Sequence, residues 1–167
     1  MSFSERMKES LGVEGARVEV AAPEGAVPVG QDAALKISIV GGSRDAQVDN
    51  LILRLIESRR HWRTPEGNVI GEDEAQQRPD RRQLMPTWSR RIVAENTLAV
   101  NEHVAAGENH QLDIPLALPG DCGLTTPACV ITVNAQADIK GQIDPTGTAT
   151  LMTGAAAQPE TQPEAQA

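Results

Sequence analysis

The chain has 167 residues, 15 of them basic and 23 acidic, so its formal net charge is −8. This length suits one domain, because domains commonly run roughly 100–200 residues. Aromatic residues make up only 2% of the sequence, so we expect an aliphatic core. An acidic chain with so few aromatic rings lacks both the cations that bind phosphate backbones and the rings on which bases stack. This excludes a general nucleic-acid binder.

The two ends of the sequence differ from its middle. Residues 1–14 place Phe3, Met7 and Leu11 on one stripe at helical spacing, which predicts a short helix packed on the domain. Residues 155–167 carry no large apolar side chain and predict a disordered tail. The sequence has neither a run of about 18 apolar residues nor the apolar core of a signal peptide. We therefore expect a cytoplasmic protein without a transmembrane segment.

Most of residues 15–154 follow the two-residue period of β-strands. Apolar and polar side chains alternate in residues 16–22, 34–40, 49–62, 110–118, 129–139 and 148–153. In the fifth of these segments Ile131 and Val133 face one side, while Thr132 and Asn134 face the other. Such alternation is typical of strands with one dry and one wet face. Because long helical periods are absent, the sequence predicts an all-β fold, an antiparallel β-sandwich of the immunoglobulin-like kind.

Residues 63–89 interrupt this alternation. They carry three prolines and few apolar residues, and they separate two predicted strands. A loop longer than about 12–15 residues in a compact domain is usually functional or disordered. Within it, residues 71–77 predict one helical turn, which Pro79 would end. We therefore expect a long insert between two strands of the sandwich.

Arginines gather in and around this insert. Nine of the 15 basic residues lie in one window: Arg54, Arg59, Arg60, Arg63, Arg78, Arg81, Arg82, Arg90 and Arg91. The same region holds six acids with which they can pair internally: Glu57, Glu66, Glu72, Asp73, Glu74 and Asp80. Internal pairing would make the insert a solvated zwitterionic segment. The alternative is a docking surface, because the planar guanidinium group binds carboxylates and phosphates bidentately.

If the insert is a docking surface, specific arginine and tryptophan side chains are expected to contact the partner. Tryptophan and arginine are the residue types that most often dominate binding energy at interfaces. We predict that the arginines contact acidic groups of a partner and that two tryptophans anchor the contact, with Met85 as a further apolar candidate. The predicted partner-binding residues are Arg59, Arg60, Trp62, Arg63, Arg81, Arg82 and Trp88.

Catalytic and metal-binding patterns are not found in the sequence. Ser43 lies in a Gly-Gly-Ser-Arg turn rather than in a nucleophile elbow, and no phosphate-binding glycine loop occurs. His61, His103 and His110 are scattered and match no metal-ligand spacing. We therefore predict a protein that is not an enzyme and that uses no cofactor and no metal.

The two cysteines, Cys122 and Cys129, are too far apart in sequence for a zinc knuckle. In a reducing cytosol they should remain thiols. Cys129 shares the parity of the core side chains, so we expect it to behave as a small buried hydrophobe. Reversible disulfide formation between the two stays an alternative.

The order of the segments resembles the bacterial sporulation-control family of arrestin-like proteins. Residues 16–57 are similar to its opening, in which a strand, a Pro/Gly turn, a second strand ending in Gly-Gly and a third strand follow a short helix. Residues 95–126 resemble a later stretch, and residues 137–151 are similar to its signature through Asp138-Ile139 and Asp144-Pro145-Thr146. Gly147 stands where that signature has aspartate. The resemblance covers residues 1–153 apart from the insert, and only the N-terminal half of the family.

This resemblance implies an arrestin-like sandwich and a non-enzymatic cytoplasmic regulatory or adaptor protein that acts by protein–protein recognition. The partner is expected to be acidic if it binds the arginine-rich insert. The family's second half would be supplied by homo-oligomerisation through a sheet edge, or by another chain added to that edge. Two alternatives stay open: a structural self-assembling subunit, and a binder of an anionic ligand or lipid through the same insert.

Overall fold

The computed structural model describes residues 15–156. The predicted N-terminal helix lies outside this range, as does the predicted tail except for Ala155 and Ala156, which are both exposed. The strands, in chain order, are β1 (Arg17–Ala21), β2 (Val27–Pro28), β3 (Asp32–Val40), β4 (Ala46–Arg63), β5 (Val69–Ile70), β6 (Met85–Val104), β7 (Asn109–Ala117), β8 (Cys129–Ile139), β9 (Thr146–Leu151) and β10 (Thr153–Gly154). Two short helical segments, α2 (Glu72–Gln77) and the 3-10 turn η1 (Arg81–Gln83), lie between β5 and β6.

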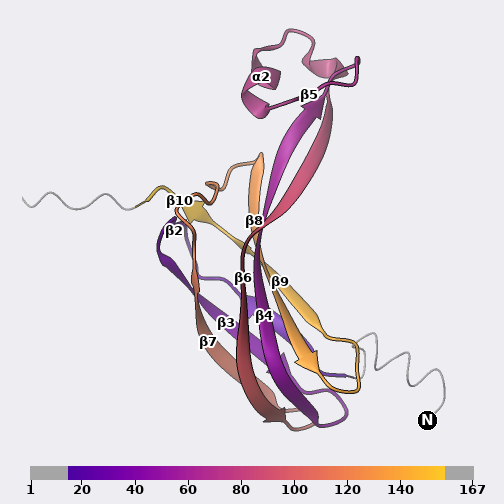
Figure 1. Cartoon of the computed structure of the whole chain (residues 1–167), viewed down its shortest axis with the longest axis vertical. Helices are drawn as coiled ribbons and strands as arrows, with labels where there is room; N and C mark the ends of the chain where they lie inside the picture. The colour runs from indigo at the N-terminus through magenta and orange to yellow at the C-terminus, as the bar shows by residue number, and fades with distance from the viewer. Residues whose placement is uncertain (1–14, 157–167) are drawn as a thin grey trace, which may run out of the picture.

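The strands form the two layers of a β-sandwich (Figure 1). One sheet has the antiparallel order β1-β3-β7. In the other, β4 lies between β6 and β8, β9 continues the sheet beyond β8, and β5 joins β4 near its end. The short strands β2 and β10 pair in parallel. The predicted all-β antiparallel sandwich is therefore confirmed. None of the helical segments within residues 15–156 has the length and apolar character needed to cross a membrane.

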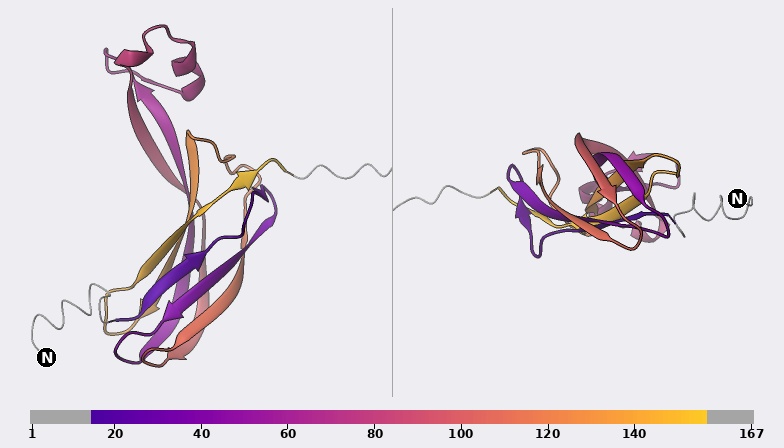
Figure 2. Two further views of the ribbon diagram at one scale, coloured as in Figure 1. Left: turned by 180° about the vertical axis from the view of Figure 1, so that it is seen from behind. Right: turned by 90° about the horizontal axis from the view of Figure 1, so that it is seen from below.

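The β4–β6 hairpin is the feature that the sequence did not predict. Strand β4 has 18 residues and β6 has 20, and they pair along their whole length. Strand β8 begins at Cys129 opposite Arg59, so residues 60–88 continue past the sandwich as a projecting hairpin (Figures 1 and 2). The expectation of a loop over residues 63–89 is wrong at its C-terminal end, because β6 begins at Met85. The non-strand part is correspondingly shorter and closes the hairpin.

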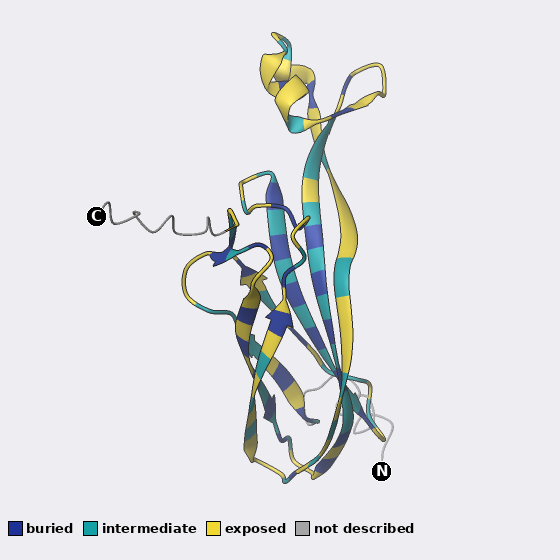
Figure 3. Cartoon of the chain, turned by 60° about the vertical axis from the view of Figure 1, so that its left-hand side comes forward, coloured by how far each residue is buried: buried dark blue, intermediate teal, exposed yellow. Residues whose placement is uncertain are grey.

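Strand β6 was not predicted from the sequence, because only one of its 20 side chains is fully buried. Within it only Val104 is buried, and the remaining positions are exposed or intermediate (Figure 3). Its inward side chains Ala94, Leu98 and Val100 pack against the core only partly buried, so the apolar alternation that marks a strand with one dry face is weak here. Two irregularities interrupt its pairing with β4, one between Leu55 and Ile56 that leaves Val93 extra on β6, and one near Asn101, whose φ is +49°. Both are bulges in β6.

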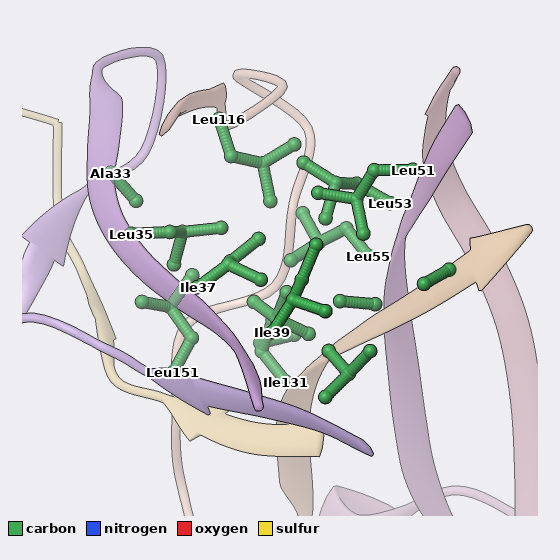
Figure 4. Packing of buried hydrophobic residues seen from close by; sticks show 14 of the residues in the cluster. Ala33, Leu35, Ile37, Ile39, Leu51, Leu53, Leu55, Leu116, Ile131 and Leu151 are labelled. Atoms are coloured by element: carbon green, nitrogen blue, oxygen red, sulfur yellow. The ribbon is translucent and has the colours of Figure 1, made fainter. Parts of the chain in front are cut away.

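The core between the sheets is aliphatic, as predicted. Most of the large, fully buried side chains come from the inward positions of β3, β4, β8 and β9, as nine of them show (Figure 4). They are Leu35, Ile37, Ile39, Leu51, Leu53, Leu55, Ile131, Val133 and Leu151. Each contributes roughly 1.5–3 kcal/mol relative to an exposed position. Cys122 and Cys129 belong to the same cluster as free, buried thiols.

A second, smaller core stabilises the end of the projecting hairpin. It consists of Ile70, Ala75 and Leu84, with Trp62 packed against it. The predicted helical turn is confirmed as α2, which ends at Gln77, one residue before its C-cap Arg78 and two before Pro79. Because Ala75 on α2 is buried in this cluster, the helix is fixed against the outer face of β4 rather than left in solvent.

A close contact with the backbone of β1 explains why residue 147 is a glycine. A Cβ atom at this position would lie 2.4 Å from the carbonyl oxygen of Val18, where β9 passes close to the backbone of β1. No side chain fits there without moving one sheet away from the other. The departure from the aspartate of the family signature therefore coincides with a close approach of β1 to β9.

We expect Gly147→Ala to lower the free energy of unfolding by about 1–3 kcal/mol, because overpacking against backbone cannot relax easily. Urea denaturation measures the effect. The control is Gly120→Ala, at a position where a Cβ would meet nothing within 4 Å. Equal stability of the two variants would contradict the close approach.

Candidate interaction surface on the projecting hairpin

A buried carboxylate lies where the hairpin leaves the sandwich. Glu57 is only 1% exposed. Its Oε1 atom accepts hydrogen bonds from Arg59 Nε at 2.6 Å and from Arg91 Nε at 3.1 Å. Its Oε2 atom accepts from the backbone N–H of Gly123 at 2.8 Å and from Arg91 Nη2 at 3.3 Å. One side chain thus joins β4, β6 and the β7–β8 connection.

The electrostatics of Glu57 follow from these contacts. Burial raises its pKa, but the hydrogen bonds from Arg59, Arg91 and the Gly123 amide outweigh burial and bring the pKa down from 4.5 to about 2. The two guanidinium groups are each about half exposed, so water covers their outer faces. The carboxylate is therefore charged at neutral pH and fully satisfied inside the protein.

A second carboxylate, Glu72 of α2, holds the end of the hairpin. It accepts two hydrogen bonds from Arg60, at 3.1 Å from Nε and 2.6 Å from Nη2, and one from Trp62 Nε1 at 2.7 Å. The Arg60 guanidinium lies 4.9 Å from the centre of the Trp62 ring. The hydrogen bond with Arg60 is the main reason that the pKa of Glu72 falls to about 2. These contacts tie α2 to β4.

The predicted partner-binding residues divide into two groups. Arg59, Arg60 and Trp62 are engaged inside the chain, by Glu57 and Glu72 as described above. Within residues 15–156, the guanidinium groups of three others, Arg63, Arg81 and Arg82, form no ion pair. The internal-pairing interpretation thus describes part of the arginine window. The partner contacts of all these side chains stay predictions.

Trp88, the seventh predicted residue, lies on a different face. It pairs with Arg60 across the ladder, whereas Met85 pairs with Arg63. Because successive side chains of a strand point to opposite faces, Trp88 and Arg63 lie on opposite faces of the hairpin. Trp88 is 48% exposed on the outer face of β6, next to the Arg60–Glu72 pair. It is therefore not on the same face of the hairpin as Arg63.

The end of the hairpin exposes apolar and cationic side chains, and the acids Glu66, Asp73 and Glu74 are exposed on the same segment. Val69 and Met85 lie directly across from Arg63 on either side of it, and they are 58% and 68% exposed. Arg81 and Arg82 lie on η1, shortly before Met85. We call these five residues, Arg63, Val69, Arg81, Arg82 and Met85, the tip surface. Val69 was not predicted from the sequence, because only the β4–β5 register places it beside Arg63.

A groove separates α2 from the turn that precedes β8. Its volume is about 780 Å³, and Arg59, Arg60 and His61 form its floor. The wall on α2 carries Asp73 and Glu74, and the opposite wall carries Leu124 and Pro127. Because acids line it alongside the arginines, the groove is not a cationic cradle for an anion. The free cations of the tip surface lie outside it.

The two cysteines adjoin the Glu57 site. A Cβ atom built on Gly123 would lie 2.7 Å from Cys129 Sγ and 2.9 Å from Glu57 Oε2, so the backbone at this point is in contact with both groups. Burial is the main cause that raises the pKa of the Cys122 and Cys129 thiols. Raised pKa values favour the neutral thiol, which is the less reactive form.

Replacing Glu57→Gln should lower the free energy of unfolding at neutral pH by about 1–3 kcal/mol, because charge-assisted hydrogen bonds to a buried group are lost. The pKa of Glu57 is lower in the folded state, so its stabilising contribution is complete above pH 4.5 and is lost as the pH falls toward about 2. The difference between parent and variant should therefore shrink over this interval. Urea denaturation at a series of pH values measures it.

The matched control is Glu95→Gln, which breaks the more exposed ion pair with Arg54. Such a pair contributes about 0.2–1 kcal/mol. A Glu57→Gln effect that is no larger than this control, or that stays constant down to the acid limit, would contradict the role given to the buried carboxylate.

Comparison with known proteins identifies a similar structure and a protein family. The fold is similar to the crystal structure of Spo0M, a sporulation control protein from Bacillus subtilis, with a TM-score of 0.63 and 17% sequence identity. The likeness covers 86% of this chain and 50% of that one, so this chain spans about half the length of its structural relative. At this identity the likeness concerns the fold alone.

Two further solved structures have lower similarity. They are the solution structure of R. palustris CsgH (TM-score 0.25, 13% identity, 81% of this chain and 91% of that one) and BslA, a bacterial hydrophobin (TM-score 0.31, 8% identity, 86% and 97%). These scores carry no argument. No curated protein sequence matches the chain. The sequence does match a family model over residues 4–154, so the chain belongs to the family described as SpoOM protein (Spo0M).

Proposed function

We propose that this chain is a non-enzymatic, cytoplasmic regulatory protein of the sporulation-control type, and that it acts by binding an acidic partner protein with its tip surface. Family membership and the printed role of the Bacillus subtilis relative support the regulatory role. The observation that carries the mechanism is the partition of the arginines. Those near the sandwich are neutralised by Glu57 and Glu72, while Arg63, Arg81 and Arg82 form no ion pair within residues 15–156.

The position of the tip surface favours an acidic partner over a basic one. The chain as a whole carries a net charge of −8, so its body repels other acidic proteins. A partner's carboxylates can approach where the arginines project beyond that body, and complementary charges of this kind raise the association rate. Val69 and Met85 supply apolar area beside Arg63, which excludes water from the ion pairs formed there.

The two carboxylate clamps make the tip surface suitable for recognition. An isolated two-stranded hairpin is marginally stable in water. Here Glu57 fixes the direction in which the hairpin leaves the sandwich, and Glu72 fixes α2 against β4. A surface held in this way loses little conformational entropy when it binds, so more of the contact energy appears as affinity.

The proposal is tested by capture of proteins from a lysate of the host organism, with the purified chain immobilised. Charge reversal in the double variant Arg81→Glu/Arg82→Glu should weaken capture of the specific partner roughly tenfold, equal to about 1.4 kcal/mol. The loss should diminish as salt screens the interaction. The control is Lys36→Glu/Lys140→Glu, which makes the same change in net charge on exposed positions of the sandwich.

Equal capture by the parent and the Arg81/Arg82 variant at low salt would contradict the tip surface as the binding site. A chain in which residues 64–84 are replaced by a short Gly/Ser turn provides a second test, because both β4 and β6 remain. It should lose the partner altogether. Stabilisation of the parent by phosphate-bearing ligands, with no protein captured, would instead favour an anionic ligand or lipid.

A further inference from the structure

Strand β6 forms an open edge of its sheet. Arg60 donates its backbone N–H to Ala128, so the even-numbered residues of β4 direct their backbone groups toward β8. The odd-numbered residues then bond to their partners on β6, which include Thr87, Ser89 and Arg91. The β6 residues between these partners direct their N–H and C=O groups out of the sheet.

The outward set is defined by the register. On one side of the Val93 bulge it consists of Pro86, Trp88, Arg90 and Ile92, and on the other side of Glu95, Thr97 and Ala99. Pro86 has no N–H to donate, which is the arrangement expected of a proline on a sheet edge. All seven side chains lie on the outer face, because they oppose the even-numbered residues of β4 rather than Leu51, Leu53 and Leu55 of the core.

The side chains along this edge are self-complementary. Trp88 is 48% exposed and Ile92 is 57% exposed. Arg90 has no ion pair within the part of the chain that the structure describes, while Glu95 is half exposed and uses Oε2 in a 2.7 Å ion pair with Arg54 Nε. A cation and an anion thus lie at similar distances on either side of an exposed apolar centre. This is the pattern that an isologous contact requires, since every contact of such an interface occurs twice.

We propose that a second copy of this chain pairs with this edge, β6 antiparallel to β6, about a two-fold axis between Ile92 and Val93. In this register Arg90 lies opposite Glu95 of the second copy, and Trp88 lies opposite its Thr97. Opposite charges across a pair of strands stabilise it, and like charges destabilise it. A shift of two residues in either direction places Arg90 opposite Val93 or Thr97 and loses both ion pairs. The charges therefore select one register.

The bulge fits the same arrangement. Val93 is the extra residue of β6 and lies next to the proposed axis. The regular half of β6 before the bulge pairs with the regular half of the second copy after it, so the two bends coincide at the centre. The pairing joins the two sheets into one and directs the two tip surfaces toward opposite ends of the dimer. It uses none of the tip residues and is independent of the proposed function.

The experiment measures the dissociation constant of the full chain by sedimentation equilibrium over a wide range of concentration. Arg90→Glu brings two carboxylates together across the two-fold axis, and Glu95→Arg brings two guanidinium groups together, so each variant alone should weaken self-association roughly tenfold or more. An equimolar mixture of the two variants should restore the dimer, because each mixed dimer contains one ion pair with the parent charges and one with the charges reversed. Arg82→Glu, which makes the same charge change on the tip, should leave the dissociation constant unaltered.

Restoration in the mixture also shows that both variants are folded. A parent chain that stays monomeric at every concentration overturns the proposal, and so does a dimer that the two edge variants do not weaken or that their mixture does not restore. Hydrogen exchange of the Trp88 and Arg90 amides gives a second readout, since both should become slower as the dimer forms. Loss of partner capture by the Arg81/Arg82 variant with an unchanged dimer separates this test from that of the proposed function.

Discussion

The buried carboxylate of Glu57 is the interaction on which the shape of the molecule depends. Moving a charge out of water is costly, and the cost is met here by the two arginines and one backbone amide that surround it. Arg59 lies on β4, Arg91 on β6 and Gly123 in the connection that leads to β8. A single group thus couples both strands of the hairpin to the sandwich, and the hairpin leaves it in a defined direction.

A second carboxylate, Glu72, is held in the same way by hydrogen-bond donors at the end of the hairpin. Glu72 binds Arg60 and Trp62, and a small apolar cluster closes over them. Two acids of the arginine window are therefore used as structural clamps, while the tip surface keeps three arginines that form no ion pair within residues 15–156. The end of the hairpin in this way exposes three arginines outside ion pairs of the described chain, together with the exposed acids Glu66, Asp73 and Glu74 of the same segment.

The tip surface and the β6 edge are separate parts of the same hairpin. The tip offers side chains, whereas the edge offers backbone groups flanked by Trp88 and Arg90. A dimer formed through the edge would leave the tip surfaces free and would carry two of them.

The sequence alone was sufficient for the sandwich and its core. Strands such as β3, β4 and β8 have one buried and one solvent-exposed face. Apolar and polar residues therefore alternate along their sequences with a period of two. The helical turn at residues 71–77 was also predictable, because its end is determined locally by Pro79. The aliphatic character of the core follows directly from the near absence of aromatic residues.

The position of β6, the pairing of the arginines and the strand register could be known only from the folded structure. Strand β6 buries only Val104 fully and packs Ala94, Leu98 and Val100 against the core in part, so its apolar period is weak, and its first residues were predicted as loop. The sequence supplied nine arginines and six acids but not their pairing, because the contact between Glu57 and Gly123 joins residues 66 positions apart. The strand register determines which arginines form no ion pair in the described part of the chain. It also places Val69 beside Arg63. Register is a property of the assembled sheet, set by contacts between distant segments, and no single segment contains it.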